Sequence, residues 1–302
     1  MIDPGTRSTW TSVTVNIALA MLQVAVGVAS HSQALVSDGI HSLSDLASDF
    51  IVLIASWQGR KAPDADHPYG HQRFETAASL ALGLILLGVG VVMVWSALER
   101  IAHVGSIPQV HASALAVALV ALASKELLFR YMLRVARRLD SNLLTANAWH
   151  ARSDAASSLV VAIGIGGNMA GYALLDPAAA LLVGFLVGRM GFVFGWRALG
   201  DLVDHAASAD EVTAIRAILA ATPGVHDVHE VRTRRMGDSL VVDAHLAVDG
   251  QLSVREGHAI AVEARRRVMA SRLRVLNVMT HVDPYPYPEG VKMDRMFSGR
   301  VG

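Results

Sequence analysis

Two pairs of side chains repeat one spacing in different parts of the chain and have the chemistry of metal ligands. His41 and Asp45 stand four residues apart, and His150 and Asp154 repeat the pattern later. On a helix, residues i and i+4 lie on one face, one turn apart. Two imidazoles and two carboxylates are the number and type of ligand that tetrahedral Zn²⁺ accepts. The sequence therefore predicts a four-ligand cation site built from two helices; the alternative is a salt bridge or hydrogen bonds between helices.

The same four groups also exchange protons with water. Metal binding requires neutral histidines and ionised carboxylates, so it releases protons. A site that exchanges a divalent cation for protons is the physical core of an antiporter. Asp38 and Asp49 lie about one turn away on either side of the first pair. We expect them to cap the helix or lie near the water interface and do not assign them as ligands; the alternative is that they are charges at the entrance of the site.

The composition indicates that these helices lie in a membrane. Of the 302 residues, 53% are hydrophobic and only 17% are charged, whereas soluble domains carry roughly 25% charge. A carboxylate at the bilayer centre costs about 3 kcal/mol or more, so it usually faces a functional cavity. The formal net charge is zero, which argues against a nucleic-acid partner. Cysteine is absent, which excludes thiolate ligands and disulfides.

Apolar runs predict about six transmembrane helices. Lys and Arg occur mainly in alternate loops, which we expect to face the cytoplasm. The sequence therefore predicts a multi-pass protein of the inner (cytoplasmic) membrane with both termini on the cytoplasmic side. The predicted helices are Trp10–Ala29, Val36–Trp57, Ala77–Leu98, Val110–Ser124 continued by Lys125–Arg138, Leu159–Leu175 with Leu143–Ser158 as its start, and Ala178–Trp196.

After Leu202 the sequence has the pattern of a small α+β domain with αββαβ order and its helices on one face of a sheet. A capping box, Ser253-x-x-Glu256, opens the second of its helices. The predicted helices are Asp210–Ala221 and Ser253–Arg272, and the predicted strands are Val225–Arg234, Ser239–Val248 and Val275–Val282. We therefore expect a membrane domain at 1–205, a cytoplasmic metal-binding dimerisation domain at 206–286 and a flexible tail at 287–302.

Three segments resemble motifs of the cation diffusion facilitator family, in the family's order. They are SQALVSDGIHSLSD at 32–45, DHPYGH at 66–71 and AWHARSD at 148–154. The chain is similar to bacterial zinc and iron efflux-type members over nearly its whole length. The resemblance implies six transmembrane helices and a cytoplasmic ferredoxin-like, metallochaperone-like αββαβ domain. It also implies a homodimer that is not an enzyme and exports Zn²⁺ and related cations in exchange for protons.

By position, the family's transport site corresponds to His41, Asp45, His150 and Asp154. Some bacterial members carry Asp where this sequence has His41. In the family, His at that position goes with a preference for zinc and poorer cadmium transport. The resemblance therefore implies Zn²⁺ as both transported and regulatory ion, with Fe²⁺, Co²⁺ and Cd²⁺ as further candidates.

The resemblance also implies two more metal sites and a charge pair that locks the dimer near the membrane surface. The loop site is Asp64, His67 and His71; the cytoplasmic binuclear site is His229, His245, His258, His281 and Asp283, with Asp283 bridging two ions; the charge pair is Arg73 and Asp204. Spacing alone lets His67 and His71 share one helical turn. The alternatives are a solvated polar loop, scattered surface histidines and ordinary juxtamembrane charges.

Two other classes of function compete with transport. A membrane metal hydrolase would need an open coordination position and a general base. The sequence contains no His-Glu-x-x-His, and no further Glu stands beside the four candidate ligands. A membrane-anchored metal sensor would use only the C-terminal histidines, and the matching His-Asp pairs in two predicted spans argue against a passive anchor.

Overall fold

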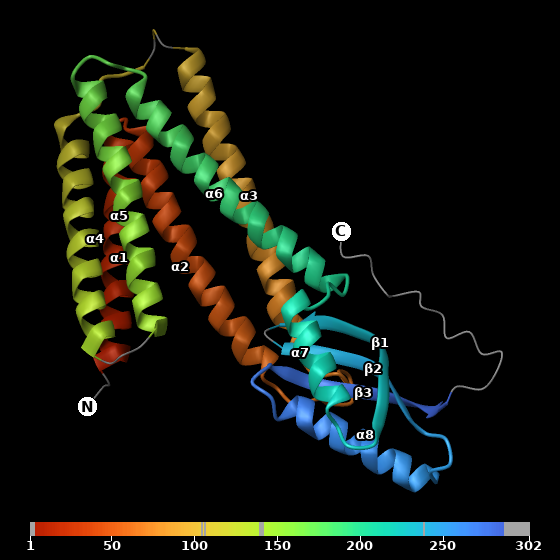
Figure 1. Cartoon of the computed structure of the whole chain (residues 1–302). Coiled ribbons are helices and arrows are strands. Elements are labelled where there is room, and N and C mark those ends of the chain that lie inside the picture. The colour runs from red at the N-terminus through yellow and green to blue at the C-terminus, as the bar shows by residue number, and fades with distance from the viewer. Residues whose placement is uncertain (1–3, 104, 106, 139–141, 238, 287–302) are drawn as a thin grey trace. The chain divides into compact units, whose positions relative to one another are not determined.

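The computed structural model contains six long helices followed by a small α/β segment (Figure 1). The structure describes residues 4–103, 105, 107–138, 142–237 and 239–286, so the predicted tail at 287–302 lies outside the described residues. The long helices are α1 (Pro4–Ala29), α2 (Gln33–Gly59), α3 (Arg73–Ala102), α4 (Ala112–Arg138), α5 (Asn142–Met169) and α6 (Leu175–Leu202). Contacts divide the chain into two units, Met1–Ile54 with Ser79–Trp196 and Ala55–Ala78 with Arg197–Gly302.

Five helices within the described residues are long and apolar enough to cross a membrane, namely α1 from Trp10, α2, α3, α4 and α6. The remaining long helix, α5, has 28 residues and carries His150, Arg152 and Asp154 in its first half. These polar residues explain why composition does not identify α5 as a span. The prediction that Leu143–Ser158 and Leu159–Leu175 belong to one helix is confirmed up to Met169, where α5 ends. Leu175 is instead the first residue of α6.

Small side chains allow the membrane helices to pack closely. Ala114 and Ala118 of α4 are buried against Val161 and Ile165 of α5, and Figure 1 shows these two helices side by side. Helices α3 and α6 approach through glycines. A Cβ atom added to Gly90 would lie 2.4 Å from the Cα of Gly188, too close for any side chain.

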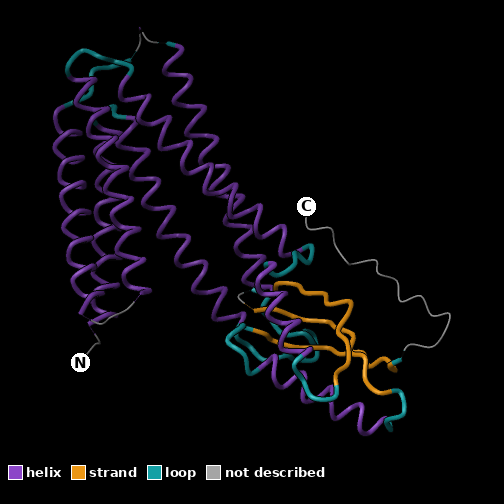
Figure 2. Tube along the Cα trace, viewed as in Figure 1, coloured by secondary structure: helices purple, strands orange, loops and turns teal. Residues whose placement is uncertain are grey.

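The αββαβ order is confirmed in the second unit. Its elements are α7 (Ala209–Ala220), β1 (Val225–Met236), β2 (Ser239–Asp249), α8 (Val254–Met269) and β3 (Val275–Tyr285). The three strands form one sheet in the order β1-β2-β3, with β1 antiparallel and β3 parallel to β2 (Figure 2). Capping boxes open both helices, at Ser208 with Glu211 and, as predicted, at Ser253 with Glu256.

Both helices of this unit cover the same face of the sheet, as predicted. Ile215 of α7 and Ala264 of α8 share one buried core with Val242 and Leu246 of β2. Successive residues of a strand point to opposite faces. The neighbour of Leu246, His245, therefore lies on the face that the two helices leave uncovered.

Candidate metal centres

Three groups of His and Asp side chains among the described residues place their ligand atoms close enough to hold an ion. In each group, one atom from every residue lies within 4.8 Å of the others. The first group lies in the membrane helices, the second in the loop after α2 and the third on the sheet.

In the membrane group, His41 and Asp45 of α2 face Asp154 of α5. The spacing of four residues brings His41 Nδ1 to 3.6 Å from an Asp45 carboxylate oxygen, as the helical period requires. Both side chains are largely buried, with 13% and 15% of their surface exposed. Three of the four predicted transport ligands are therefore already close together.

The fourth predicted ligand, His150, is exposed and lies outside this close group. It still lines the same cavity of about 60 Å³ as Asp45 and Asp154. This cavity lies between α1, α2, α4 and α5, and its wall also includes Ser42 and Lys125. The cavity wall thus combines three predicted ligands, Asp45, His150 and Asp154, with two polar side chains that spacing does not associate with them.

In the loop group, Asp64 is the central residue. Its carboxylate accepts a hydrogen bond of 2.7 Å from the backbone N–H of His67. The ring of His67 lies 3.3 Å from one carboxylate oxygen, and Nε2 of His71 lies 3.3 Å from the other. The backbone hydrogen bond from His67 is the main reason that the pKa of the Asp64 carboxyl lies below its usual value.

The structure corrects one detail of this loop. His67 and His71 do not share a helical turn, because α3 begins only at Arg73. Gly70 adopts a φ of +90°, and its N–H donates to the carbonyl of His67 in a turn. A side chain would be strained at that φ, so glycine allows the chain to fold back there. The turn brings the two imidazole rings to 4.4 Å, centroid to centroid.

On the sheet, strand register brings three predicted histidines into one row. His229 of β1 pairs with His245 of β2, and His245 pairs with His281 of β3. Residues paired directly across a sheet project from the same face. The ring centroids are 5.2 Å apart for the first pair and 4.7 Å for the second. The row lies on the face opposite α7 and α8.

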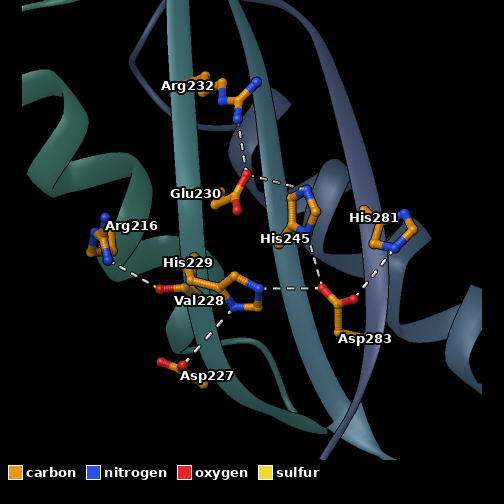
Figure 3. Close-up of polar contacts among 9 residues, drawn as sticks. All are labelled: Arg216, Asp227, Val228, His229, Glu230, Arg232, His245, His281 and Asp283. Carbon is orange, nitrogen blue, oxygen red and sulfur yellow. Dashed lines mark hydrogen bonds and ion pairs between the residues drawn. The ribbon is translucent and has the colours of Figure 1, made fainter. Parts of the chain in front are cut away.

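Asp283 connects the three histidines of this row (Figure 3). Its Oδ2 lies 3.3 Å from His229 Nε2 and 3.0 Å from His245 Nδ1, while its Oδ1 lies 3.3 Å from His281 Nε2. Asp283 is two residues after His281 on β3, so both project from the same face. Asp283 thus directs one oxygen to His229 and His245 and the other to His281.

The close ligand group on the sheet consists of His229, His245 and Asp283. Two predicted members lie outside it: His281, whose side chain is 65% exposed although it belongs to the row, and His258. His258 is an exposed residue of α8 and belongs to none of the three groups found among the described residues. Glu230 lies near the row instead, with its carboxylate 3.9 Å from His245 Nε2 and 3.0 Å from Arg232. A β-bulge between His229 and Arg232, with Glu230 at a φ of 44°, places it there.

The predicted charge pair is present within one chain. Arg73 Nη2 lies 2.7 Å from an Asp204 carboxylate oxygen, and Arg73 Nη1 donates to the carbonyl of Leu202. Asp204 adopts a φ of 61° just after α6. The pair therefore connects the start of α3 with the end of α6.

The expectation that Asp38 caps the helix or lies near water is wrong. Its side chain is fully buried and pairs with Lys125 of α4 at 3.4 Å. The side chain of Asp49 lies outside the described residues. Lys125 is noticeable in the sequence because it follows an apolar run. Its pairing with Asp38 could not be predicted, because the two residues lie on different helices.

The chain matches two family models. Residues 9–203 match the cation efflux transmembrane domain, and residues 207–285 match the cytoplasmic domain of cation efflux proteins. The first match extends from within α1 to the end of α6, and the second covers the sheet with α7 and α8.

Individual proteins are similar over most of the chain. Metal tolerance protein C1 of Arabidopsis thaliana is 33% identical over 90% of this chain, which spans 61% of that protein's length. Manganese efflux system protein MneP of Bacillus subtilis is 29% identical over 89% of this chain and 93% of its own. The solved metal-bound C-terminal domain of the CzcD transporter from Thermotoga maritima is 34% identical over 26% of this chain and 93% of its own, with a TM-score of 0.25.

Proposed function

Since this chain belongs to the cation efflux, or cation diffusion facilitator, family, whose members transport metal cations and are not enzymes, we propose that it exports Zn²⁺ from the cytoplasm in exchange for protons. The observation that carries the proposal is the group of His41, Asp45 and Asp154 in the membrane helices. His150, which lines the same cavity, completes the proposed set of four ligands.

The chemistry of these ligands supports both zinc and proton exchange. Imidazole suits Zn²⁺ and other late transition metals, whereas sites for Mn²⁺ favour carboxylate, carbonyl and water oxygen. Two histidines among four ligands therefore favour Zn²⁺ over Mn²⁺, although the relative MneP is named as a manganese efflux protein. Fe²⁺, Co²⁺ and Cd²⁺ are the further candidates. Protonation of the ligands on the far side of the membrane would displace the cation, because protons and metal compete for the same atoms.

The two other groups have regulatory roles in this proposal. Asp64, His67 and His71 would bind a metal ion weakly, because three ligands leave a position for water. The row of His229, His245 and His281 with Asp283 would bind cytoplasmic zinc as a binuclear site, and His258 would join it only after its side chain moves. Metal bound there stabilises whichever arrangement of a homodimer binds it better.

The proposal includes an arrangement in the membrane. Residues 1–205 form the transmembrane domain, with α5 as the sixth span, and residues 206–286 form the cytoplasmic domain. The two family matches, which meet between 203 and 207, support this division. Both termini lie on the cytoplasmic side of the cell (inner) membrane, as the loop charges indicate.

The experiment is Zn²⁺ flux into proteoliposomes under an imposed pH gradient. We expect zinc entry that depends on the opposing proton gradient and falls at least about tenfold in Asp154→Asn, which keeps the side chain's shape but removes its charge. Asp201→Asn, at the end of α6 and outside all three groups, is the matched control.

Each negative outcome has a definite meaning. Zinc flux without dependence on the gradient would contradict antiport and leave export intact. Flux of Mn²⁺ or Fe²⁺ but not of Zn²⁺ would contradict the metal assignment. Stoichiometric zinc binding with no flux of any cation would favour the sensor alternative.

A further inference from the structure

A buried ion pair lies beside the proposed transport site. Asp38 of α2 has no exposed surface, and the Lys125 side chain of α4 is 3% exposed. The ammonium group of Lys125 uses all three of its donors, to Asp38 at 3.4 Å, to Ser42 at 3.1 Å and to Ser158 at 2.8 Å. Three helices, α2, α4 and α5, therefore fix this positive charge in place.

The carboxylate of Asp38 is held equally firmly. Its Oδ2 accepts hydrogen bonds from Ser158, at 2.7 Å, and from Gln23 of α1, as well as the contact with Lys125. Its Oδ1 accepts no hydrogen bond from the described residues. Burying two charges is costly, and such a pair is often replaceable by apolar residues without loss of stability. Stability alone therefore does not explain why the pair is present.

The position of Lys125 indicates a different role. Lys125 lines the same cavity as Asp45 and Asp154, and Ser42, which it contacts, follows His41 directly. Metal binding requires neutral histidines. The charged groups at the site are then the carboxylates of Asp45 and Asp154 and the ammonium of Lys125, which line the cavity. The carboxylate of Asp38 contacts Lys125 from outside the lining. The net charge of these four groups is −2, which one divalent cation neutralises. Without Lys125 the same group would carry −3, and without Asp38 it would carry −1.

We propose that Lys125, held by Asp38, is a positioning residue whose fixed charge matches the transport site to one divalent cation. This inference rests on the proposed function, because it assigns a role beside the ligands named there. Lys125 does not bind the cation. It limits how tightly the carboxylates hold the ion, and so permits release on the far side.

The test compares three variants of the full chain in detergent or nanodiscs: Lys125→Gln, Asp38→Asn and the double variant. Because the chain has other proposed metal sites, Zn²⁺ binding at the transport site is measured as the part of the binding that is lost in Asp154→Asn. We expect Lys125→Gln to lower the Kd about tenfold and to slow transport at saturating zinc. Asp38→Asn should raise the Kd about tenfold, the order expected for one unit charge at short range in a partly screened site. The double variant, again at −2, should return within about threefold of the wild type.

If the pair of Asp38 and Lys125 had only a structural role, the Kd values of the variants would shift differently. Removal of either partner would then weaken binding, because both single variants disturb the same helix contacts. A shift of the two Kd values in the same direction would therefore overturn the inference. Lys125→Met removes the charge while keeping a similar volume, and it replaces Lys125→Gln if that variant does not fold. Lys125→Arg, which keeps the charge, should stay near the wild-type Kd.

Failure of the proposed function would look different from failure of this inference. If Asp154→Asn leaves zinc binding and flux unchanged, the assignment of the transport site is wrong. If Asp154→Asn abolishes binding and flux while Lys125→Gln and Asp38→Asn shift the Kd alike, the site stands and the role of Lys125 does not.

Discussion

A single carboxylate contacts all three histidines of the cytoplasmic row. Asp283 lies within 3.3 Å of ring nitrogens of His229, His245 and His281, and its side chain is only 12% exposed. Asp283→Asn keeps the shape but removes the charge that attracts a cation. We expect zinc affinity of the full chain's cytoplasmic site to fall at least about tenfold, in the range found for lost ligands and their close partners. Isothermal titration measures the loss.

The control for this prediction lies on the same sheet. His226 is also a histidine of β1, but its ring stacks on Tyr285 and belongs to none of the close groups among the described residues. His226→Gln should leave zinc affinity within about twofold of the wild type. Equal losses in both variants would show that the sheet, and not the ligand, had been damaged.

Glu263 of α8 provides a test of pH dependence away from the metal sites. Hydrogen bonds from Arg266 and Arg267 lower its pKa from 4.5 to about 2. A lowered folded-state pKa contributes stability above pH 4.5, and that contribution is lost as the pH falls toward about 2. Glu263→Gln should therefore lower the melting temperature at pH 7 by a small amount, since the pair is exposed, and by less at pH 2. A difference that grows on acidification would contradict the assignment.

At the residue scale, the sequence predicts ligands better than it predicts their neighbours. The spacing of His41 and Asp45 fixes their relation because both lie on one helix. The partner of Asp38 lies on another helix, and the position of Glu230 depends on a bulge with a positive φ. Neither relation follows from a local pattern, because each depends on how separate elements pack.

At the scale of elements, the contact between α3 and α6 depends on glycines that permit close approach. Gly90→Ala would place a methyl group 2.4 Å from Gly188, in contact with backbone that cannot move away without separating the helices. We expect this variant to lose folded yield or melt at a clearly lower temperature, as measured by size-exclusion chromatography and a thermal scan.

Gly88, two residues earlier on α3, is the matched control. A Cβ added there meets nothing within 4 Å. Gly88→Ala should be neutral or stabilise the chain by up to about 1 kcal/mol, because alanine favours a helix over glycine. Similar damage from both substitutions would contradict the packing argument.

Elements with strong local signals are predicted well, and the others less so. The box at Ser253 and Glu256 predicts the start of α8 because both of its hydrogen bonds are local. Helix α5 is not identified as a membrane span by its length and hydropathy, because its first half is polar. The mixed sheet is also beyond local patterns, because strand order is decided by the connections and the packing of α7 and α8.

At the scale of the whole molecule, substitutions of Arg73 and Asp204 test whether this charge pair controls dimer formation. Both side chains are about half exposed, at 45% and 51%, so their pair should contribute less than about 1 kcal/mol to stability. The resemblance to the family implies that this pair, which forms within one chain, also locks the dimer near the membrane surface. We therefore expect Arg73→Glu to leave the melting temperature nearly unchanged but to reduce the dimer fraction and zinc flux. Light scattering and the proteoliposome assay measure these two quantities.

The reversed pair provides the control for this prediction. Arg73→Glu combined with Asp204→Arg restores opposite charges at the same two positions and should recover much of the flux. Loss of flux that the reversal does not recover would show that Arg73 acts through another contact, such as its hydrogen bond to the Leu202 carbonyl.

The row of histidines across the sheet has a consequence for divergence among related proteins. Its spacing follows from the separation of hydrogen-bonded strands, about 4.8 Å, and not from the side chains themselves. Replacing His229, His245 or His281 by another donor would change the chemistry offered to an ion while the backbone keeps the donors evenly spaced. The cation preference of such a centre can therefore change by single substitutions over evolutionary time, while its architecture persists.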